Sequence, residues 1–444
     1  MKRYLLIMIS LLVAGVAEGQ NGFNVPFSQF SVGESELPYN MPWVYGMCGV
    51  TISRASRNTV NPFNPASYAA VEEESLWFDI GVNIQQSTLR KGDAKLTDAA
   101  GDIAYLAIAF PVTKWWKTSA GIMPYSKMNY ESVNTSYDPL SGSNVETVYS
   151  GGGGVTQVYW GNAFNITKNL SAGFNINYLF GSIERAITYN FVGNDTSYMM
   201  DKRSQKNTQV SNLLVDLGVQ YRQPLNEQYT LNTGLTCRLP RSMQVTDQSL
   251  VYTLVETSTD EYLLDTIFPV RGADDTYLST LEQPFAFGVG VALERNELWQ
   301  VAVDVCYAPW SGLKYTENID YNVFGKSALD YAPNWRVALG GEWMGDKNAS
   351  SYWKRIGVRA GVYYNKGRLA LDMTMNPTVG QKTSLDEVGC GLGFALPMRK
   401  GRSVLNISMG YSSFGNIDLL RRNCFTVGLS VGSCERWFVK RRYN

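Results

Sequence analysis

The chain has 444 residues, a formal net charge of zero and no histidine, and only 18% of its residues are charged, against about 25% in ordinary soluble proteins. A neutral chain lacks the strong basic excess of an electrostatic nucleic-acid binder. A chain without histidine cannot form a Ser-His-Asp triad, a Cys-His pair or an imidazole metal site. We therefore expect no nucleic-acid partner, no metal, no cofactor and no enzymatic activity.

The first 19 residues have the pattern of a secretory signal peptide. Lys2 and Arg3 precede an apolar run over residues 4–16, and the small residues Ala17 and Gly19 follow it. We expect cleavage after Gly19. The alternative is an uncleaved anchor, but about 20 apolar residues are needed to span a membrane. Beyond this segment, no stretch approaches the length and hydrophobicity of a transmembrane helix.

Many separate segments alternate between large apolar residues and small or polar ones, which is the period of a β-strand. In one such segment the large residues are Trp299, Val301, Val303, Val305 and Tyr307, and the others are Gln300, Ala302, Asp304 and Cys306. The pattern recurs in 285–293, 335–343, 356–364, 388–396 and 425–432. The small or polar face is rich in glycine and alanine, and aromatic residues recur near the ends of the runs. We therefore expect the large residues to face lipid and the small ones to face a lumen, as in outer-membrane barrels.

The alternation predicts fourteen strands, and bacterial barrels have an even number. The predicted strands are 76–90, 103–112, 115–131, 155–166, 170–191, 204–224, 229–246, 280–294, 297–311, 328–344, 354–366, 383–397, 403–414 and 422–438. Most connectors after odd-numbered strands are long, notably 132–154, 192–203, 247–279 and 312–327, whereas those after even-numbered strands are shorter. Such barrels have short periplasmic turns and long external loops, so both chain ends are expected in the periplasm. The predicted fold is all-β: a transmembrane antiparallel β-barrel over residues 76–444, in the outer membrane of a Gram-negative-type cell.

Residues 20–75 lack the pattern of strands. They contain scattered glycines and five prolines, at positions 26, 38, 42, 62 and 65, and proline is poorly tolerated inside a sheet. A barrel of about fourteen strands has a bore too wide for its own side chains to fill. We therefore expect these residues to form an N-terminal hatch, a plug inside the lumen. The alternative is a loose periplasmic extension.

These features together resemble the FadL-type family of outer-membrane transporters for long-chain fatty acids and other hydrophobic compounds. The resemblance rests on the signal peptide, the segment Asn61-Pro62-Phe63-Asn64-Pro65-Ala66 and an aromatic-bearing first strand from Ser75. It implies a fourteen-stranded barrel with an N-terminal hatch, whose motif here is Asn64, Pro65 and Ala66. The stretch 20–42 has no counterpart that we can match in that family's hatch.

The same resemblance implies an interrupted third strand beside the hatch, which opens a hole in the barrel wall. The third predicted strand here carries Pro124. Proline removes a hydrogen-bond donor from the ladder and bends the strand, so Pro124 is the candidate for a lateral opening. The alternative is a proline at a harmless bulge.

Two further groups of residues are candidate ligand contacts. The connector 247–279 carries an apolar cluster where a ligand could enter, since exposed apolar clusters often mark binding sites; alternatively, the cluster packs the loop onto the rim. Its members are Tyr262, Leu263, Leu264, Ile267 and Phe268. In the lumen, Arg336 or Arg359 could meet a carboxylate head group, although lumen charges usually pair with neighbours such as Glu342.

The leading hypothesis is a passive transporter that admits hydrophobic, fatty-acid-like molecules through a hatch-gated barrel with lateral exit. A dry pocket suits such cargo, because apolar burial contributes about 25 cal/mol per Å². The alternative is a FadL-like barrel that serves as a non-transporting subunit of an outer-membrane secretion or assembly complex. A water-filled porin is a further class, which ion conductance would reveal. Expected partners are outer-membrane lipids, hydrophobic small molecules, the barrel-assembly machinery during biogenesis, and proteins bound at external loops.

Overall fold

The computed structural model describes residues 24–29, 32–35, 41–55, 59–139, 142–192, 201–256, 261–269, 276–296, 298–310, 315–316, 330–346, 349–367, 369–372, 382–398, 403–416 and 420–436. The predicted signal peptide, residues 1–19, lies outside these ranges and stays a prediction. Among the described residues, none of the helices is long and apolar enough to cross a membrane.

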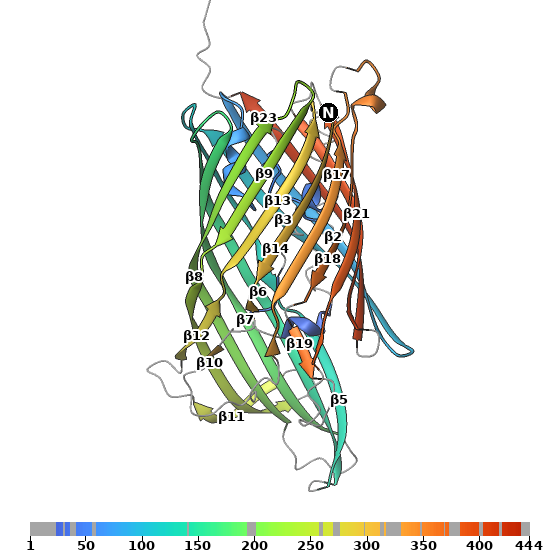
Figure 1. Cartoon of the computed structure of the whole chain (residues 1–444). Helices are drawn as coiled ribbons and strands as arrows, with labels where there is room; N and C mark the ends of the chain where they lie inside the picture. Colours follow the sequence, from blue (N-terminus) through green and yellow to red (C-terminus); the bar gives the residue numbers. More distant parts are fainter. Residues whose placement is uncertain are drawn as a thin grey trace, which may run out of the picture.

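The strands form a closed wall in which all neighbours are antiparallel (Figure 1). In order around the wall they are β2 (Ser75–Lys91), β3 (Ala94–Pro111), β4 (Trp116–Lys127), β6 (Ser143–Asn165), β7 (Leu170–Val192), β8 (Asp201–Pro224), β9 (Tyr229–Arg238) continued by β10 (Arg241–Glu256), β12 (Thr276–Gln283) continued by β13 (Ala286–Arg295), β14 (Trp299–Ala308), β17 (Asn334–Trp343), β18 (Gly357–Lys366), β21 (Glu387–Met398), β22 (Ser403–Asn416) and β23 (Leu420–Arg436). β2 and β23 close the ring through sixteen residue pairs, from Ser75 with Arg436 to Arg90 with Arg421. With each interrupted strand counted once, the wall has fourteen positions, which confirms the predicted fold class.

The remaining strands are short or lie beyond the wall. β5 (Tyr130–Asp138) pairs with β6, and β11 (Glu261–Pro269) pairs with β10, so that two hairpins extend past the ring. β1 (Glu34–Ser35) pairs with β4, and β15 (Tyr315–Thr316) pairs with β12. β16 (Asp330–Tyr331), β19 (Leu369–Asp372) and β20 (Lys382–Ser384) form a separate small sheet.

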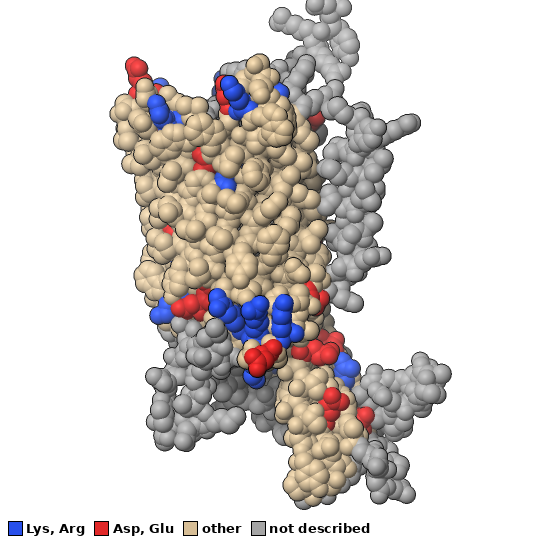
Figure 2. All heavy atoms as spheres, turned by 90° about the vertical axis from the view of Figure 1, so that its right-hand side faces the viewer, with Lys and Arg blue, Asp and Glu red and all other residues tan. Residues whose placement is uncertain are grey.

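The two faces of the wall differ in the way that the alternation predicted. On β14, Val301 and Val303 are 47% and 40% exposed on the outer face, whereas Ala302 and Asp304 are 1% exposed on the inner face. On the side of the barrel drawn in Figure 2, few charged side chains lie across the middle of the outer face, and most of them are gathered near its two ends. This direction is the one that a membrane-spanning barrel needs, because its outer face meets hydrocarbon.

The two ends of the barrel differ in their connections. Short turns join β3 to β4, β6 to β7, β8 to β9 and β13 to β14 at the end drawn uppermost in Figure 1. We call this the turn end. The hairpins β5–β6 and β10–β11 extend from the opposite end, here called the hairpin end.

Two of the segments predicted as long connectors between strands consist largely of strands instead. Residues 132–154 lie largely in β5 and β6, and residues 247–279 contain the end of β10, β11 and the start of β12. These parts of the strands contain polar residues such as Asn134 and Asp247. A strand that extends beyond the band of large apolar side chains on the outer face does not need an apolar face of its own. The hydrophobic period of two therefore ends before the strands do.

A non-strand segment fills the inside of the barrel. Residues 41–55 and 59–71, here called the inner segment, contain α2 (Pro42–Tyr45) and η2 (Pro65–Ala70). Their side chains form much of the buried core; Trp43 and Met47, for example, are 1% and 0% exposed. A short η1 helix (Pro26–Gln29) precedes the segment, and η4 (Tyr352–Arg355) lies between β17 and β18.

Glycines on the inner face of the wall make room for this segment. A Cβ atom at Gly234 of β9 would lie 2.1 Å from the Ile52 carbonyl oxygen, and one at Gly340 of β17 would lie 2.8 Å from the Met47 carbonyl oxygen. At Gly410 of β22 it would lie 2.1 Å from the ring of Tyr45. Because glycines far apart around the ring all contact it, the inner segment lies within the lumen.

Candidate functional site

The Asn-Pro-Ala motif forms a capped turn that presses against the wall. The Asn64 side chain accepts a hydrogen bond from the Ala66 amide (3.1 Å), and donates one to the Ile52 carbonyl oxygen (2.6 Å). This is the usual role of asparagine before a helical turn that starts with proline. A Cβ atom at Gly218 of β8 would lie 2.1 Å from the Asn64 Oδ1 atom and 2.8 Å from Pro65. The motif therefore anchors one side of the inner segment to β8.

Polar wall residues hold the backbone of the inner segment from the other side. Asp304 of β14 accepts hydrogen bonds from the amides of Thr51 (2.6 Å) and Ile52 (2.7 Å). Arg336 of β17 donates a hydrogen bond to the Cys48 carbonyl oxygen (2.5 Å). The structure thus places the predicted lumen cation Arg336 against the inner segment. Sequence reasoning did not assign a role to Asp304, because its partners are backbone atoms more than 250 residues away.

A buried ion-pair network joins the inner segment to two more strands. Glu342 of β17 is bound by Arg359 of β18 (Nε to Oε1, 2.7 Å) and by Arg54 of the inner segment. Arg359 also donates a hydrogen bond to the Asn406 side chain of β22 (2.7 Å). Burial lowers the pKa of Arg54 to about 10, although Glu342 favours the charged form. The predicted candidates Arg359 and Glu342 are brought together, and Arg54, which sequence reasoning missed, completes the network.

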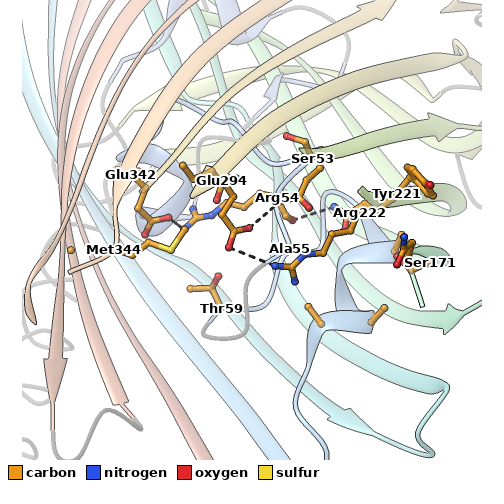
Figure 3. Close-up of a pocket in the computed structure, with 18 of the residues that line it drawn as sticks. Ser53, Arg54, Ala55, Thr59, Ser171, Tyr221, Arg222, Glu294, Glu342 and Met344 are labelled. Carbon is orange, nitrogen blue, oxygen red and sulfur yellow. Dashed lines mark hydrogen bonds and ion pairs between the residues drawn. The ribbon is translucent and has the colours of Figure 1, made fainter. Parts of the chain in front are cut away.

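A cavity of about 1190 Å³ opens beside this network at the turn end. Figure 3 shows Arg54, Arg222, Glu294 and Glu342 converging on it. Arg222 of β8 pairs with Glu294 of β13 at 3.7 Å. The charged residues in the cavity wall are Arg54, Lys168, Arg222, Arg355, Arg359, Glu294 and Glu342. The lining therefore carries five positive and two negative side chains.

A second cavity, of about 630 Å³, lies toward the hairpin end. Its charged lining residues are Glu34, Asp102, Lys127, Arg336, Glu387 and Arg422. The two cavities share no lining residue, and the buried side chains of Trp43, Met47 and Val50 line neither of them. The inner segment thus separates two cavities, each of which has charged side chains in its wall.

The pairing between β3 and β4 stops part of the way along the wall. Leu106 with Ile122 is the last pair toward the hairpin end, although β3 continues to pair with β2 as far as Ala94. Beyond that point, the ladder of β4 with β6 has an irregularity between Pro124 and Ser126. Pro124, the predicted candidate for a lateral opening, therefore lies at a break in the regular wall, and it lines the second cavity.

The chain's own N-terminal region occupies the edge of β4 that β3 leaves. In β1, Glu34 pairs with Lys127 and Ser35 with Ser126. The Glu34 carboxylate is bound by the Arg422 guanidinium of β23, with one contact at 2.6 Å. Lys127 forms an ion pair with Asp102 of β3 across the break. The break is thus bridged by one backbone strand and one partly exposed ion pair.

The predicted apolar cluster at the hairpin end lies on β11 rather than in an irregular loop. Tyr262, Leu263 and Phe268 pair with Val255, Leu254 and Val251 of β10. The side chains of this cluster, with those of Leu264 and Ile267, lie outside the described atoms, and its role as a ligand contact stays a prediction.

The closed fourteen-position wall, with part of the chain folded inside it, is the fold of FadL-type barrels. The family model BamG matches residues 1–444, and the chain belongs to the BamG family. No curated protein matches the chain.

Solved structures share the fold at low sequence identity. The CymD monoaromatic hydrocarbon channel is 13% identical with a TM-score of 0.55, over 92% of this chain and 99% of that one. The Ralstonia pickettii toluene transporter TbuX is 12% identical with a TM-score of 0.53, over 88% and 97%. A Pseudomonas aeruginosa FadL homologue is 11% identical with a TM-score of 0.55, over 89% and 98%. The first of these is named as a channel and the second as a transporter, and at such identities the likeness of all three defines the fold alone.

Proposed function

We propose that this chain is a non-transporting barrel subunit of an outer-membrane assembly complex, with its turn end in the periplasm and the inner segment as a fixed plug. The observation that carries the proposal is the attachment of the inner segment to the wall. Asp304, Arg336 and Glu342 hold it through buried hydrogen bonds and ion pairs. Displacing the plug would leave buried charges without partners, which typically costs several kcal/mol.

The charged side chains in the walls of both cavities support the same proposal. A hydrophobic cargo gains free energy by leaving water for an apolar surface. Here it would instead meet charged side chains such as Asp102, Lys127 and Arg422. Stripping water from these groups without giving them new partners is unfavourable.

Membership of the BamG family also supports an assembly role. The family name points to barrel assembly. The alternative hypothesis from the sequence, a non-transporting subunit of an outer-membrane secretion or assembly complex, agrees with such a role. In such a role, the rigid wall and the extended hairpins β5–β6 and β10–β11 would offer surfaces to other proteins.

Depletion of the chain in its own cell tests this function. We expect the amount of folded outer-membrane barrels, measured by heat-modifiable mobility on gels, to fall after depletion and to recover with the wild-type chain. Unchanged barrel levels, together with slower uptake of a hydrophobic compound, would contradict the assembly role.

Passive transport of hydrophobic, fatty-acid-like compounds is the second candidate, and the break between β3 and β4 favours it. A wall that loses its ladder beyond Leu106 and Ile122 offers a route into the bilayer once β1 moves. Uptake of a radiolabelled fatty acid by proteoliposomes tests this candidate. Transport predicts faster uptake than in empty liposomes, and it is excluded if the two rates agree.

A further inference from the structure

A row of cations crosses three neighbouring strands on the outer face at the hairpin end. In the strand register, Arg90 of β2 lies opposite Lys95 of β3 on one side and Arg421 of β23 on the other. Neighbouring strands are about 4.8 Å apart, so three positive side chains start within about 10 Å of each other. We call these three residues the cationic row.

The direction of these side chains follows from the alternation along each strand. On β2, Ile80 and Ile84 are exposed on the outer face, and Arg90 has the same parity and is also exposed. On β23, Phe425 is exposed on the outer face, and Arg421, which precedes it by four residues, has the same parity and is partly exposed. Lys95, which pairs with Arg90, is exposed as well. The cationic row therefore projects outward from the wall.

The height of the row is fixed by the rows beneath it. The apolar belt ends with Ile84 and Phe425, and the next outward row is polar, with Thr88 and Thr97 in hydrogen-bond contact at 3.2 Å. The four residues from Phe425 to Arg421 span about 13 Å along the strand. Strand tilt shortens this to about 10 Å along the membrane normal, which places the cations at the level of lipid head groups. Figure 2 shows Lys and Arg side chains gathered where the uncharged part of the wall ends.

Among the described residues, no carboxylate forms an ion pair with the cationic row. Asp98 and Asp102 of β3 belong to the opposite, inward face, and Asp102 pairs with Lys127. Asp93 lies in the β2–β3 turn. Asp386 lies next to Gly415, the residue of β22 that pairs with Arg421, and its carboxylate accepts a hydrogen bond from the Tyr364 hydroxyl (2.6 Å). Arg421 itself donates a hydrogen bond to the neutral Ser413 hydroxyl (2.7 Å).

Like charges directly opposite each other on paired strands are destabilising, and here the two arginines and the lysine are such neighbours. A bound anion removes this repulsion and accepts their hydrogen bonds, and guanidinium groups bind phosphate with matched geometry. We propose that Arg90, Lys95 and Arg421 form a binding site for the phosphate groups of an outer-leaflet glycolipid of the lipid A type. The inference rests on the outer-membrane location proposed above.

Lipid retention by the purified chain tests this site. The test variant carries Arg90→Gln, Lys95→Gln and Arg421→Gln. The matched control carries Lys114→Gln, Lys168→Gln and Lys354→Gln, which remove the same charge from exposed positions at the turn end. Each protein is extracted from its own outer membrane, washed in detergent and analysed by mass spectrometry for phosphorylated glycolipid.

We expect wild type and control to retain the glycolipid, and the ratio of lipid to protein in the test variant to fall by about tenfold or more. Equal retention by all three proteins would overturn the proposal. Single Lys95→Gln and Arg90→Gln variants, each expected to lose part of the lipid, keep the test valid if the triple variant does not fold. Heat-modifiable mobility reports folding in each case.

A second measurement distinguishes binding of the lipid from binding of free phosphate, and it does not depend on the proposed assembly role. The delipidated wild-type barrel is expected to gain thermal stability with purified lipid A in micelles and none with inorganic phosphate at the same phosphate concentration. Stabilisation by inorganic phosphate alone would reject a lipid site. Because neither readout depends on barrel assembly in cells, failure of this site leaves the proposed function standing, and the reverse also holds.

Discussion

Arg54 and Glu342 form an ion pair in which both side chains are almost fully enclosed, at 3% and 7% exposed. One partner belongs to the inner segment and the other to the wall, nearly three hundred residues later in the chain. This pair therefore joins two parts of the molecule that no local sequence pattern relates.

Removal of Arg54 should destabilise the barrel strongly. Arg54→Met leaves Glu342 with Arg359 alone, and breaking one partner of a buried ion pair typically costs about 3–5 kcal/mol. Urea-induced unfolding in detergent micelles measures the change. Lys168→Gln, on an exposed turn, is the control and should change the free energy of unfolding by less than about 0.5 kcal/mol. A similarly small change for Arg54→Met would show that the network contributes nothing to stability.

A side chain at an inner glycine should push the inner segment away from the wall. Gly234→Val brings a Cβ atom to 2.1 Å from the Ile52 carbonyl oxygen, and we expect a loss of about 1–3 kcal/mol with faster proteolysis within the inner segment. Gly341→Val is the matched control, because a Cβ atom there comes no closer than 3.6 Å to another atom. Limited proteolysis with mass spectrometry of the fragments measures the effect, and equal cleavage of both variants would contradict this packing.

The lumen should be closed to ions. The wild-type chain in planar bilayers is expected to show almost no conductance, because the buried side chains of the inner segment separate the two cavities. Deletion of residues 41–71 should raise the conductance to the level of an open pore, provided that the deleted chain still shows heat-modifiable mobility. Porin-like currents from the wild type would contradict the closed lumen.

Cys48 should be unreactive in the folded protein. It is 2% exposed, and burial raises the pKa of its thiol to about 12, so the reactive thiolate is scarce at pH 8. A variant that keeps Cys48 as its single cysteine should label with a charged maleimide only after unfolding, and raising the pH from 7 to 9 should not speed the reaction. A chain with a single cysteine introduced by Lys168→Cys is the control and should label at once. Rapid labelling of native Cys48 would show that the inner segment opens.

The wall was predictable from the sequence because the membrane imposes a strict pattern on it. Val301, Val303 and their counterparts must be large and apolar, and the residues between them must fit a crowded lumen. Where that requirement ends, prediction failed: residues 132–154 continue largely as strands, with polar side chains on both faces.

The site was less predictable because its contacts join segments that are far apart in the sequence. The two-residue alternation along a strand carries no information about which segments meet. Arg359 and Glu342 were identified as lumen charges, since they lie on alternating strands. Arg54 lies in a segment without any repeat, and its only sequence signal is a cation at the end of a largely apolar stretch. The pairing of β1 with β4 likewise follows from the edge that β3 leaves open, which no local pattern reports.

The seam between β2 and β23 links closure of the barrel to the packing of its contents. The inner segment precedes β2 in the chain, and the last strand, β23, seals the cylinder only when residues 420–436 have been made and delivered. The segment contacts strands on both sides of this seam, with Tyr45 against Gly410 of β22 and Pro42 against Gly81 of β2, so its packing is complete only when the seam has formed. Closure of the barrel and packing of the inner segment are therefore coupled in the folded protein.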